Sequence, residues 1–358
     1  MGFTNPYAAF GSGDRRVYAH SKGDQGEKMS AVEGAVTIDR HGDPAPITRM
    51  FGWAILGALA GFLINNVLNV GFGFSLPQRL FAGDTSALVT MLVLLVGIVL
   101  GAGYALRTPN NALRWDAQRI HRFNAYLIRG IFFGILFVGL ADTAISFMRV
   151  EKVFDTIFAR EIVLLFQRPD YVALYFHLPL LAFGFVIAAF TRTPGFHWLA
   201  LLIILAELSI VITRFVFSYE QAFMGDLVRY WYSGLFLLAS ALTLHEEGHV
   251  RVDILYAGLS AKKKGLFNVI GILFLGMPAM WTILAVGFAG PQSIINSPVM
   301  NFEITQTGGI GMYVKYQMAA FLGVFGATML IQFVVMLFDS VADWRDEPGH
   351  RSYDKSAQ

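Results

Sequence analysis

The chain has 358 residues, of which 55% are hydrophobic and only 15% are charged. This composition has too much apolar surface and too little charge for a soluble domain, so it predicts a protein of the lipid bilayer. The net charge of +2 is small and gives no nucleic-acid footprint, and the absence of cysteine excludes disulfides, thiolate metal sites and cysteine nucleophiles.

The chain opens with a polar stretch, residues 1–46, for which we expect a disordered tail and no signal peptide. Eight apolar stretches follow, each near the roughly 20 residues that a helix needs to cross the hydrocarbon core. None has the alternating pattern of a barrel strand, so the predicted fold is all-α: a polytopic membrane protein with about eight transmembrane helices. The sixth stretch is the shortest. The predicted helices run from Phe51 to Phe72, Ala87 to Leu106, Ala125 to Phe147, Tyr171 to Phe190, Trp198 to Phe217, Tyr230 to Leu244, Leu266 to Phe288 and Met318 to Phe338.

Positive charge gathers in two of the connecting loops, which the positive-inside rule places in the cytoplasm. Because an even number of crossings returns the chain to its starting side, both termini are predicted to be cytoplasmic as well. The loops on the other side are poorer in positive charge. The basic residues are Arg107, Arg114, Arg119 and Arg122 in the first of these loops, and Arg251 with Lys262, Lys263 and Lys264 in the second.

The segment from Arg149 to Arg168 is the exception among the outer loops, because it carries several positive charges. Its apolar residues recur at helical spacing opposite charged ones, which predicts an amphipathic helix on the outer surface. A re-entrant or loop-packing helix fits the same pattern. The apolar positions are Phe154, Phe158, Ile162 and Leu165, and the charged ones are Asp155, Arg160, Glu161 and Arg168.

The chain divides near Arg192, after the fourth apolar stretch. We expect an extra four-helix membrane bundle over residues 47–194, a second four-helix unit over 195–344 and a polar tail over 345–358. Each unit has a basic loop in its middle, as a parallel internal repeat would, although the two share no residue-level identity.

Short motifs follow one another through the second unit. In their order and spacing they resemble the small membrane subunit (DctQ-type) of TRAP (tripartite ATP-independent periplasmic) transporters, over roughly Trp198 to Trp344. The His-x-Arg-x-Asp element is the strongest match, and the helices from Phe51 to Phe190 have no counterpart in that family. The matching residues are Arg214, Asp226, Arg229 and Tyr230, then His249, Arg251 and Asp253, and finally Asn301, Glu303, Gly308, Gly309, Tyr313 and Lys315.

The resemblance implies a division of labour within a transporter of the bacterial inner membrane. A larger membrane subunit would hold the substrate and sodium sites and move as an elevator, while a periplasmic binding protein would deliver a small organic anion such as a 2-oxo or hydroxy acid. This chain would then scaffold the larger subunit. It would be no enzyme, would hold no cofactor or metal, and would bind no nucleic acid. The residues that we predict at helix or subunit interfaces are Glu207, Arg214, Arg229, Glu303 and Lys315, and we predict that His249, Arg251 and Asp253 form a structural motif in a cytoplasmic loop.

Several polar residues lie inside the predicted helices, where a charge is costly unless it faces a partner. Glu207 and Arg214 are two turns apart in the fifth helix, so they predict either a polar seam toward other helices or the large subunit, or two separate groups with Arg214 reaching the headgroups. Asp142 has Arg149 or outer water as its predicted partner, and a proton relay is a further reading. His177, beside Pro179, predicts a hydrogen-bonded histidine at a kink.

One motif points to a different class of protein. The sequence His245-Glu246-x-x-His249 matches H-E-x-x-H, which on a helix can hold zinc beside a general base, so an intramembrane zinc metalloprotease is the alternative. Gly248 is a poor helix residue, Arg251 would place a cation near the metal, and no later motif offers a third ligand. A haem subunit would need histidine pairs across the bilayer, and His177 alone lies well within a predicted helix.

Overall fold

The computed structural model describes residues 28–29, 38–193, 195–219, 221–246, 256, 258–305 and 311–349. Apart from the two-residue strands β1 (Lys28–Met29) and β2 (Ile38–Asp39), its regular elements are helices. Within the described residues, 8 helices are long and apolar enough to cross a membrane, which confirms the predicted all-α class. The predicted tails lie mostly outside the described residues.

Twelve helices and helical turns build the crossings. They are α1 (Pro46–Phe72), α2 (Ala87–Arg107), α3 (Leu113–Val150), α6 (Pro169–Val172) with η3 (Ala173–His177) and α7 (Leu178–Phe190), α8 (Phe196–Val216), α9 (Ala222–His245), α10 (Ala261–Gly271) with η4 (Ile272–Gly276) and α11 (Met277–Gly287), and α13 (Lys315–Trp344). Between them lie the short helices η2 (Pro77–Ala82), α4 (Val153–Ile157), α5 (Arg160–Phe166) and α12 (Asn296–Met300).

Two helices are longer than their apolar stretches predicted. The sixth crossing begins at Ala222 because Phe223 and Leu227 are buried in the core ahead of Tyr230. The third begins at Leu113, inside the predicted basic loop, because Asp116 there is buried against an arginine of α1. Polar residues therefore extend a helix where they find partners inside the protein.

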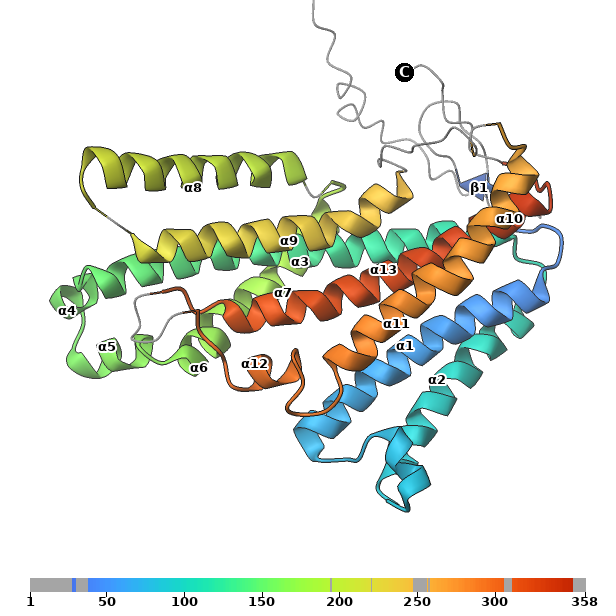
Figure 1. Ribbon diagram of the computed structural model, residues 1–358, viewed down its shortest axis with the longest axis horizontal. Coiled ribbons are helices and arrows are strands. Elements are labelled where there is room, and N and C mark those ends of the chain that lie inside the picture. Colours follow the sequence, from blue (N-terminus) through green and yellow to red (C-terminus); the bar gives the residue numbers. More distant parts are fainter. Residues whose placement is uncertain are drawn as a thin grey trace, which may run out of the picture.

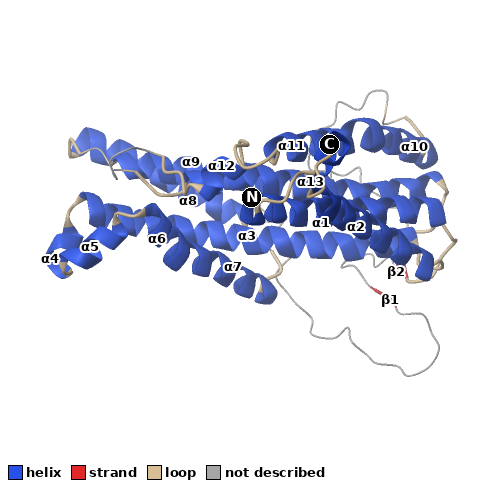
Figure 2. Ribbon diagram, turned by 90° about the horizontal axis from the view of Figure 1, so that it is seen from below, coloured by secondary structure: helices blue, strands red, loops and turns tan. Residues whose placement is uncertain are grey.

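Helices α3 and α13 form the centre of the molecule, and other helices pack around them (Figure 1). Helix α13 contacts α1, α3, α9, α10 and α11, and its apolar window is 61% buried. Helices α8 and α2 lie at opposite edges, packed on α9 and α1 respectively, and their windows are only 11% buried. Both edge helices consequently turn most of their apolar surface outward, and the molecule is broad (Figure 2).

The amino-terminal helices form two tight pairs, α1 with α2 and α3 with α7. In the first pair the backbones touch at glycines: a Cβ on Gly57 would lie 2.0 Å from the carbonyl oxygen of Gly97. In the second, a Cβ on Gly184 would lie 2.3 Å from the backbone nitrogen of Gly134. Small residues spaced four apart permit such close packing in lipid, where dispersion and close fit drive association.

Arg49 of α1 binds these pairs together at one end of the molecule. Its fully buried guanidinium lies 2.8 Å from Asp116 of α3 and donates to the Thr108 hydroxyl and backbone carbonyl after α2. Trp53 donates its indole N–H to the same carboxylate at 2.9 Å. Residues near the two described ends of the chain also lie close together here, since Arg345 donates to the Pro44 carbonyl.

The predicted amphipathic segment is helical but divided into α4 and α5, with Phe158 and Ala159 extended between them. Phe154 and Val163 are buried in a small cluster with Tyr313, while Phe158 and Ile162 are each 40% exposed. The segment therefore covers the ends of neighbouring helices, as the loop-packing alternative expects, and leaves some apolar side chains outward.

Candidate functional site: a buried polar network between the two halves

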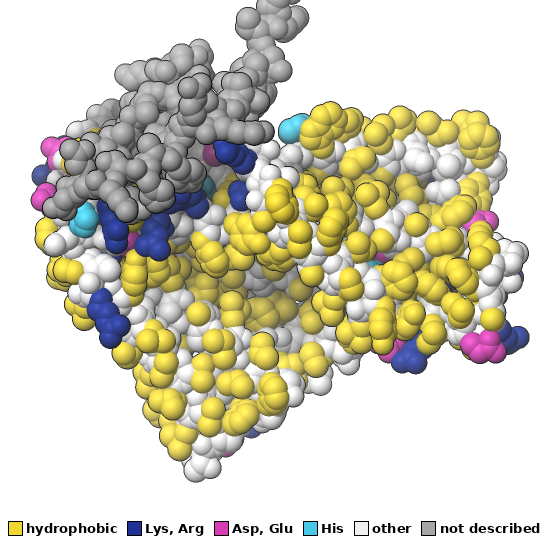
Figure 3. Space-filling model, turned by 180° about the vertical axis from the view of Figure 1, so that it is seen from behind, with side chains coloured by type: hydrophobic (Ala, Val, Ile, Leu, Met, Phe, Trp, Pro, Cys, Tyr) yellow, Lys and Arg dark blue, Asp and Glu magenta, His cyan; other side chains and the backbone are white. Residues whose placement is uncertain are grey.

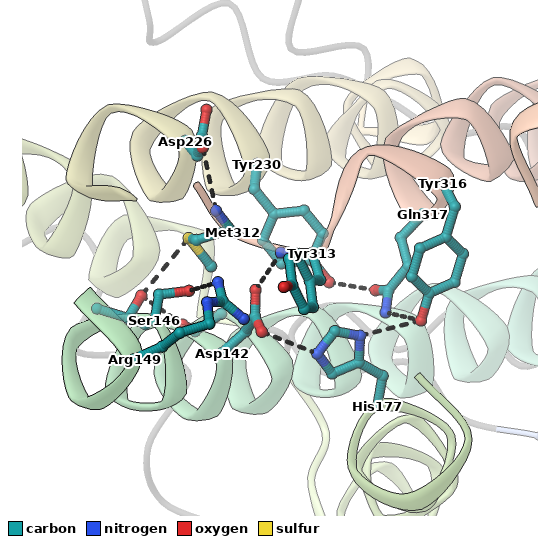
Figure 4. A network of polar contacts seen from close by, with 12 residues as sticks. Asp142, Ser146, Arg149, His177, Asp226, Tyr230, Met312, Tyr313, Tyr316 and Gln317 are labelled. Carbon is teal, nitrogen blue, oxygen red and sulfur yellow. Dashed lines mark hydrogen bonds and ion pairs between the residues drawn. The ribbon is translucent and has the colours of Figure 1, made fainter. Parts of the chain in front are cut away.

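A buried polar network surrounds the chain where it enters α13 (Figure 4). It joins residues of α3 and η3 in the amino-terminal half to residues of α9 and α13 in the second unit. The segment at its centre, Met312–Gln317, contains the Tyr313-Val-Lys315 motif.

Asp142 of α3 is the charge at the middle of this network. One of its carboxylate oxygens accepts a hydrogen bond from the Tyr313 backbone N–H at 2.7 Å, and the other lies 3.3 Å from Nε2 of His177. Both side chains are fully buried. The carboxylate is buried away from outer water and faces η3 and the α13 entry, where a buried backbone N–H needs an acceptor.

His177 links Asp142 to hydrogen-bonded side chains of α13 and α9. Its Nδ1 lies 3.0 Å from the Tyr316 hydroxyl, which also accepts a hydrogen bond from the Gln317 amide at 2.9 Å. Gln317 in turn accepts a hydrogen bond from the Tyr230 hydroxyl. His177 is the last residue of a π-helical turn and lies two residues before Pro179, a local geometry that accommodates the missing proline N–H and aims the imidazole inward. The prediction of a hydrogen-bonded histidine at a proline kink is confirmed.

Arg149 holds the same segment from the end of α3. Its guanidinium donates to the Gly311 carbonyl and lies 3.8 Å from the centroid of the Tyr313 ring. An arginine stacked on a tyrosine in a partly buried site combines cation–π attraction with a charge-assisted hydrogen bond. Asp142 and Arg149 therefore fix the backbone on both sides of Met312.

Asp226 of α9 supports the segment from the second unit. It accepts hydrogen bonds from the Thr305 hydroxyl at 2.7 Å and from the Met312 N–H at 3.1 Å, so one buried carboxylate holds these two residues together. Glu303 and Lys315 form an ion pair of 3.1 Å across the same loop. Both side chains are nearly half exposed, so this pair orients the loop more than it stabilises the fold.

The predicted interface residues fall into two groups. Glu303 and Lys315 come together, and Arg229 lies 3.8 Å from Asp226 with most of its side chain exposed. Glu207 and Arg214 instead point outward from α8 and form no ion pair with each other in the described part of the chain. The motif residues His249, Arg251 and Asp253, together with Gly308 and Gly309, lie outside the described residues.

The first histidine of the H-E-x-x-H sequence is engaged in helix packing. The His245 ring stacks on His121 of α3 with centroids 3.4 Å apart, and its Nδ1 lies 3.1 Å from the Gln332 amide of α13. Glu246 is exposed, and His249 lies outside the described residues. Within the part of the chain that the structure describes, no group of three potential metal ligands occurs.

Sequence reasoning missed most of the buried network. Asp142 and His177 stood out as polar residues in apolar stretches, but their partners Tyr313 and Tyr316 lie far away in the chain. Asp116 could have been found as the one acidic residue of a strongly basic segment, since such a residue needs a reason to be there. The glycine pairs, four residues apart in three helices, were a readable sign of helix pairing.

The helices of the described residues that are long and apolar enough to cross a membrane define a polytopic membrane protein. Its buried polar groups hold neighbouring helices and the entry to α13 in place. Residues 201–343 match the family model of the tripartite ATP-independent periplasmic transporters, DctQ component. This part of the chain, from α8 to α13, is similar to the DctQ component, which confirms the resemblance; that family is a component of transporters. Comparisons with curated proteins and with solved structures gave no match.

Proposed function

We propose that the chain is the small permease subunit of a TRAP-type secondary transporter and that it scaffolds a larger elevator subunit. That subunit would carry out sodium-driven uptake of a small organic anion, such as a 2-oxo or hydroxy acid, delivered by a periplasmic binding protein. The complex would reside in a bacterial inner membrane. The match of residues 201–343 supports the transporter family, and the polar network supports a static role.

A scaffold must not deform while its partner slides. The buried contacts of Asp142 and Arg149 join the amino-terminal helices to the α13 entry, so the two halves are held as one wall rather than as a unit with a loosely appended bundle. Four additional helices give this wall width, and width resists tilting in the bilayer. This is the role that we propose for residues 47–194.

The single observation that supports a docking surface on α8 is the exposed carboxylate of Glu207. It lies near the middle of α8, is exposed, and has no hydrogen bond or ion pair in the described part of the chain. A carboxylate left in lipid at this depth costs at least about 2.5 kcal/mol, so a partner that offers hydrogen-bond donors would be favoured. The outward face of α8 is apolar around it, with Ile204 62% and Leu208 51% exposed. We propose that the large subunit covers this face.

Affinity purification of the tagged chain from its native membranes tests the proposal. A larger multipass protein should be recovered with it, and recovery should fall more with Glu207→Ala than with Glu207→Gln, because glutamine still accepts hydrogen bonds. Glu161→Ala, which removes an exposed carboxylate on α5, serves as the control. Wild-type recovery with both Glu207 variants would remove α8 from the interface, and purification of the chain alone would contradict the subunit assignment.

A further inference from the structure

An open groove separates α1 from α3, with α13 as its floor. It has a volume of about 570 Å³ and is lined almost entirely by apolar side chains. Arg49 and Asp116 hold α1 and α3 together at one end, and the helices diverge from there. The space-filling view shows this face hollowed between the α1–α2 lobe and the rest of the molecule, with hydrophobic side chains around the hollow (Figure 3).

The walls of the groove run along the membrane-spanning helices. On α3 the lining extends from Arg119 through Phe123 and Leu127 to Ile131, a length of about 18 Å at the rise of an α-helix. One leaflet of the hydrocarbon core is about 15 Å deep, half of the whole core. The groove therefore has the depth of a single leaflet.

Its charge is confined to one end. Arg119 is the sole charged residue among those that line the groove. Its guanidinium donates to the Tyr104 hydroxyl at 2.9 Å, and the Tyr104 ring packs edge-on against Trp53, whose side chain also lines the groove. In the described part of the chain Arg119 forms no ion pair with a carboxylate. An exposed cation beside tyrosine and tryptophan is the arrangement found at the headgroup level of a bilayer.

We propose that this groove binds an anionic phospholipid of one leaflet. The acyl chains would lie between α1 and α3 against α13, and the phosphate would accept hydrogen bonds from Arg119. Apolar walls of leaflet depth fit acyl chains, and the lone cation complements an anionic headgroup. By the positive-inside prediction this is the cytoplasmic leaflet, whose surface is anionic in many membranes.

Such a lipid would fill the wedge between the two amino-terminal helix pairs. The pair α1–α2 contacts α13 and the Arg49 end, and farther along α1 Phe62 packs on Trp281 of α11 and Asn66 is hydrogen-bonded to Asn296 of α12. On the side that faces α3, no such contacts between described residues fill the groove. A bound lipid would add apolar contacts along the diverging part of α1 and α3 and would hold the angle between them. The lipid would thus stabilise the arrangement of the helices and would not be a substrate.

Native mass spectrometry of the purified full chain tests the site, with phosphatidylglycerol and phosphatidylcholine of identical acyl chains as probes. Phosphatidylglycerol should bind more tightly, and Arg119→Gln should weaken it about fivefold, the contribution of one arginine near an anionic headgroup. Arg107→Gln is the matched control, because Arg107 is exposed at the end of α2 but does not line the groove.

A second variant tests the apolar part independently. Ala60→Phe places a ring in the groove from α1 and should weaken both lipids, whereas Ala182→Phe on the exposed face of α7 should weaken neither. Folding of each variant is checked by gel filtration and thermal melting. Equal binding of both lipids to every variant overturns the proposal. So does loss of the large subunit on Ala60→Phe with lipid binding unchanged, since the groove would then hold a protein helix.

Discussion

Asp142 offers the sharpest test of the connection between the two halves. Replacing it with alanine leaves the buried Tyr313 N–H without an acceptor, which costs about 1–3 kcal/mol, and removes the partner of His177. For a buried pair broken on one side the total is about 3–5 kcal/mol. Asparagine keeps an oxygen for the Tyr313 N–H, so Asp142→Asn should cost about 2 kcal/mol less than Asp142→Ala.

The free energy of unfolding can be measured on the full chain by titrating dodecyl sulfate into mixed micelles and following tryptophan fluorescence. Asp155→Ala is the control, since Asp155 is an exposed aspartate on α4 at the same end of the molecule. Interhelical hydrogen bonds in membrane proteins average only about 0.6 kcal/mol, which sets the smallest effect worth interpreting. If Asp142→Ala were no more damaging than Asp155→Ala, or Asn as damaging as Ala, the network would not hold the halves together.

Three further predictions concern other parts of the molecule. Gly97→Leu should separate α2 from α1 and lower thermal stability, while Gly103→Leu on the open side of α2 should not; equal melting of the two would disprove the close backbone contact. Hydrogen bonds from nearby serine groups lower the pKa of Asp84, so its folded pKa lies below the unfolded value. Its contribution to the order of the η2–α2 loop should therefore be present above the unfolded pKa and vanish as pH falls through the folded one. Amide exchange in that loop checks this, and a pH-independent rate would refute it. Finally, His245→Ala with Glu246→Ala should leave transport by the complex largely intact, whereas loss of a zinc-dependent proteolytic activity would support the protease instead.

The sequence was sufficient for the class of fold because each crossing is an uninterrupted apolar stretch, and lipid leaves few choices for such a segment. It was insufficient for the partners of the polar residues. Asp142 and Arg149 are two turns apart on one helix, which made their pairing the simplest expectation. The structure brings Tyr313 and His177 to the carboxylate from elsewhere in the chain, and such contacts depend on tertiary packing.

The local sequence pattern also predicted some helix ends wrongly. The start of α3 contains Arg114 and Asp116, which read as a polar loop, yet both are buried in ion pairs with residues distant in sequence. The outward position of Glu207 on α8 could not be predicted either, because α8 has apolar residues on all of its faces. In a membrane protein the apolar face does not tell which side meets lipid and which meets protein.

Uptake by purified components in proteoliposomes tests the central claim most directly. The chain alone should move no organic anion under a sodium gradient, and neither should the larger subunit with the periplasmic binding protein when this chain is left out. All three together should support sodium-dependent uptake. Measurable uptake by this chain alone, or full uptake without it, would contradict its role as the scaffold.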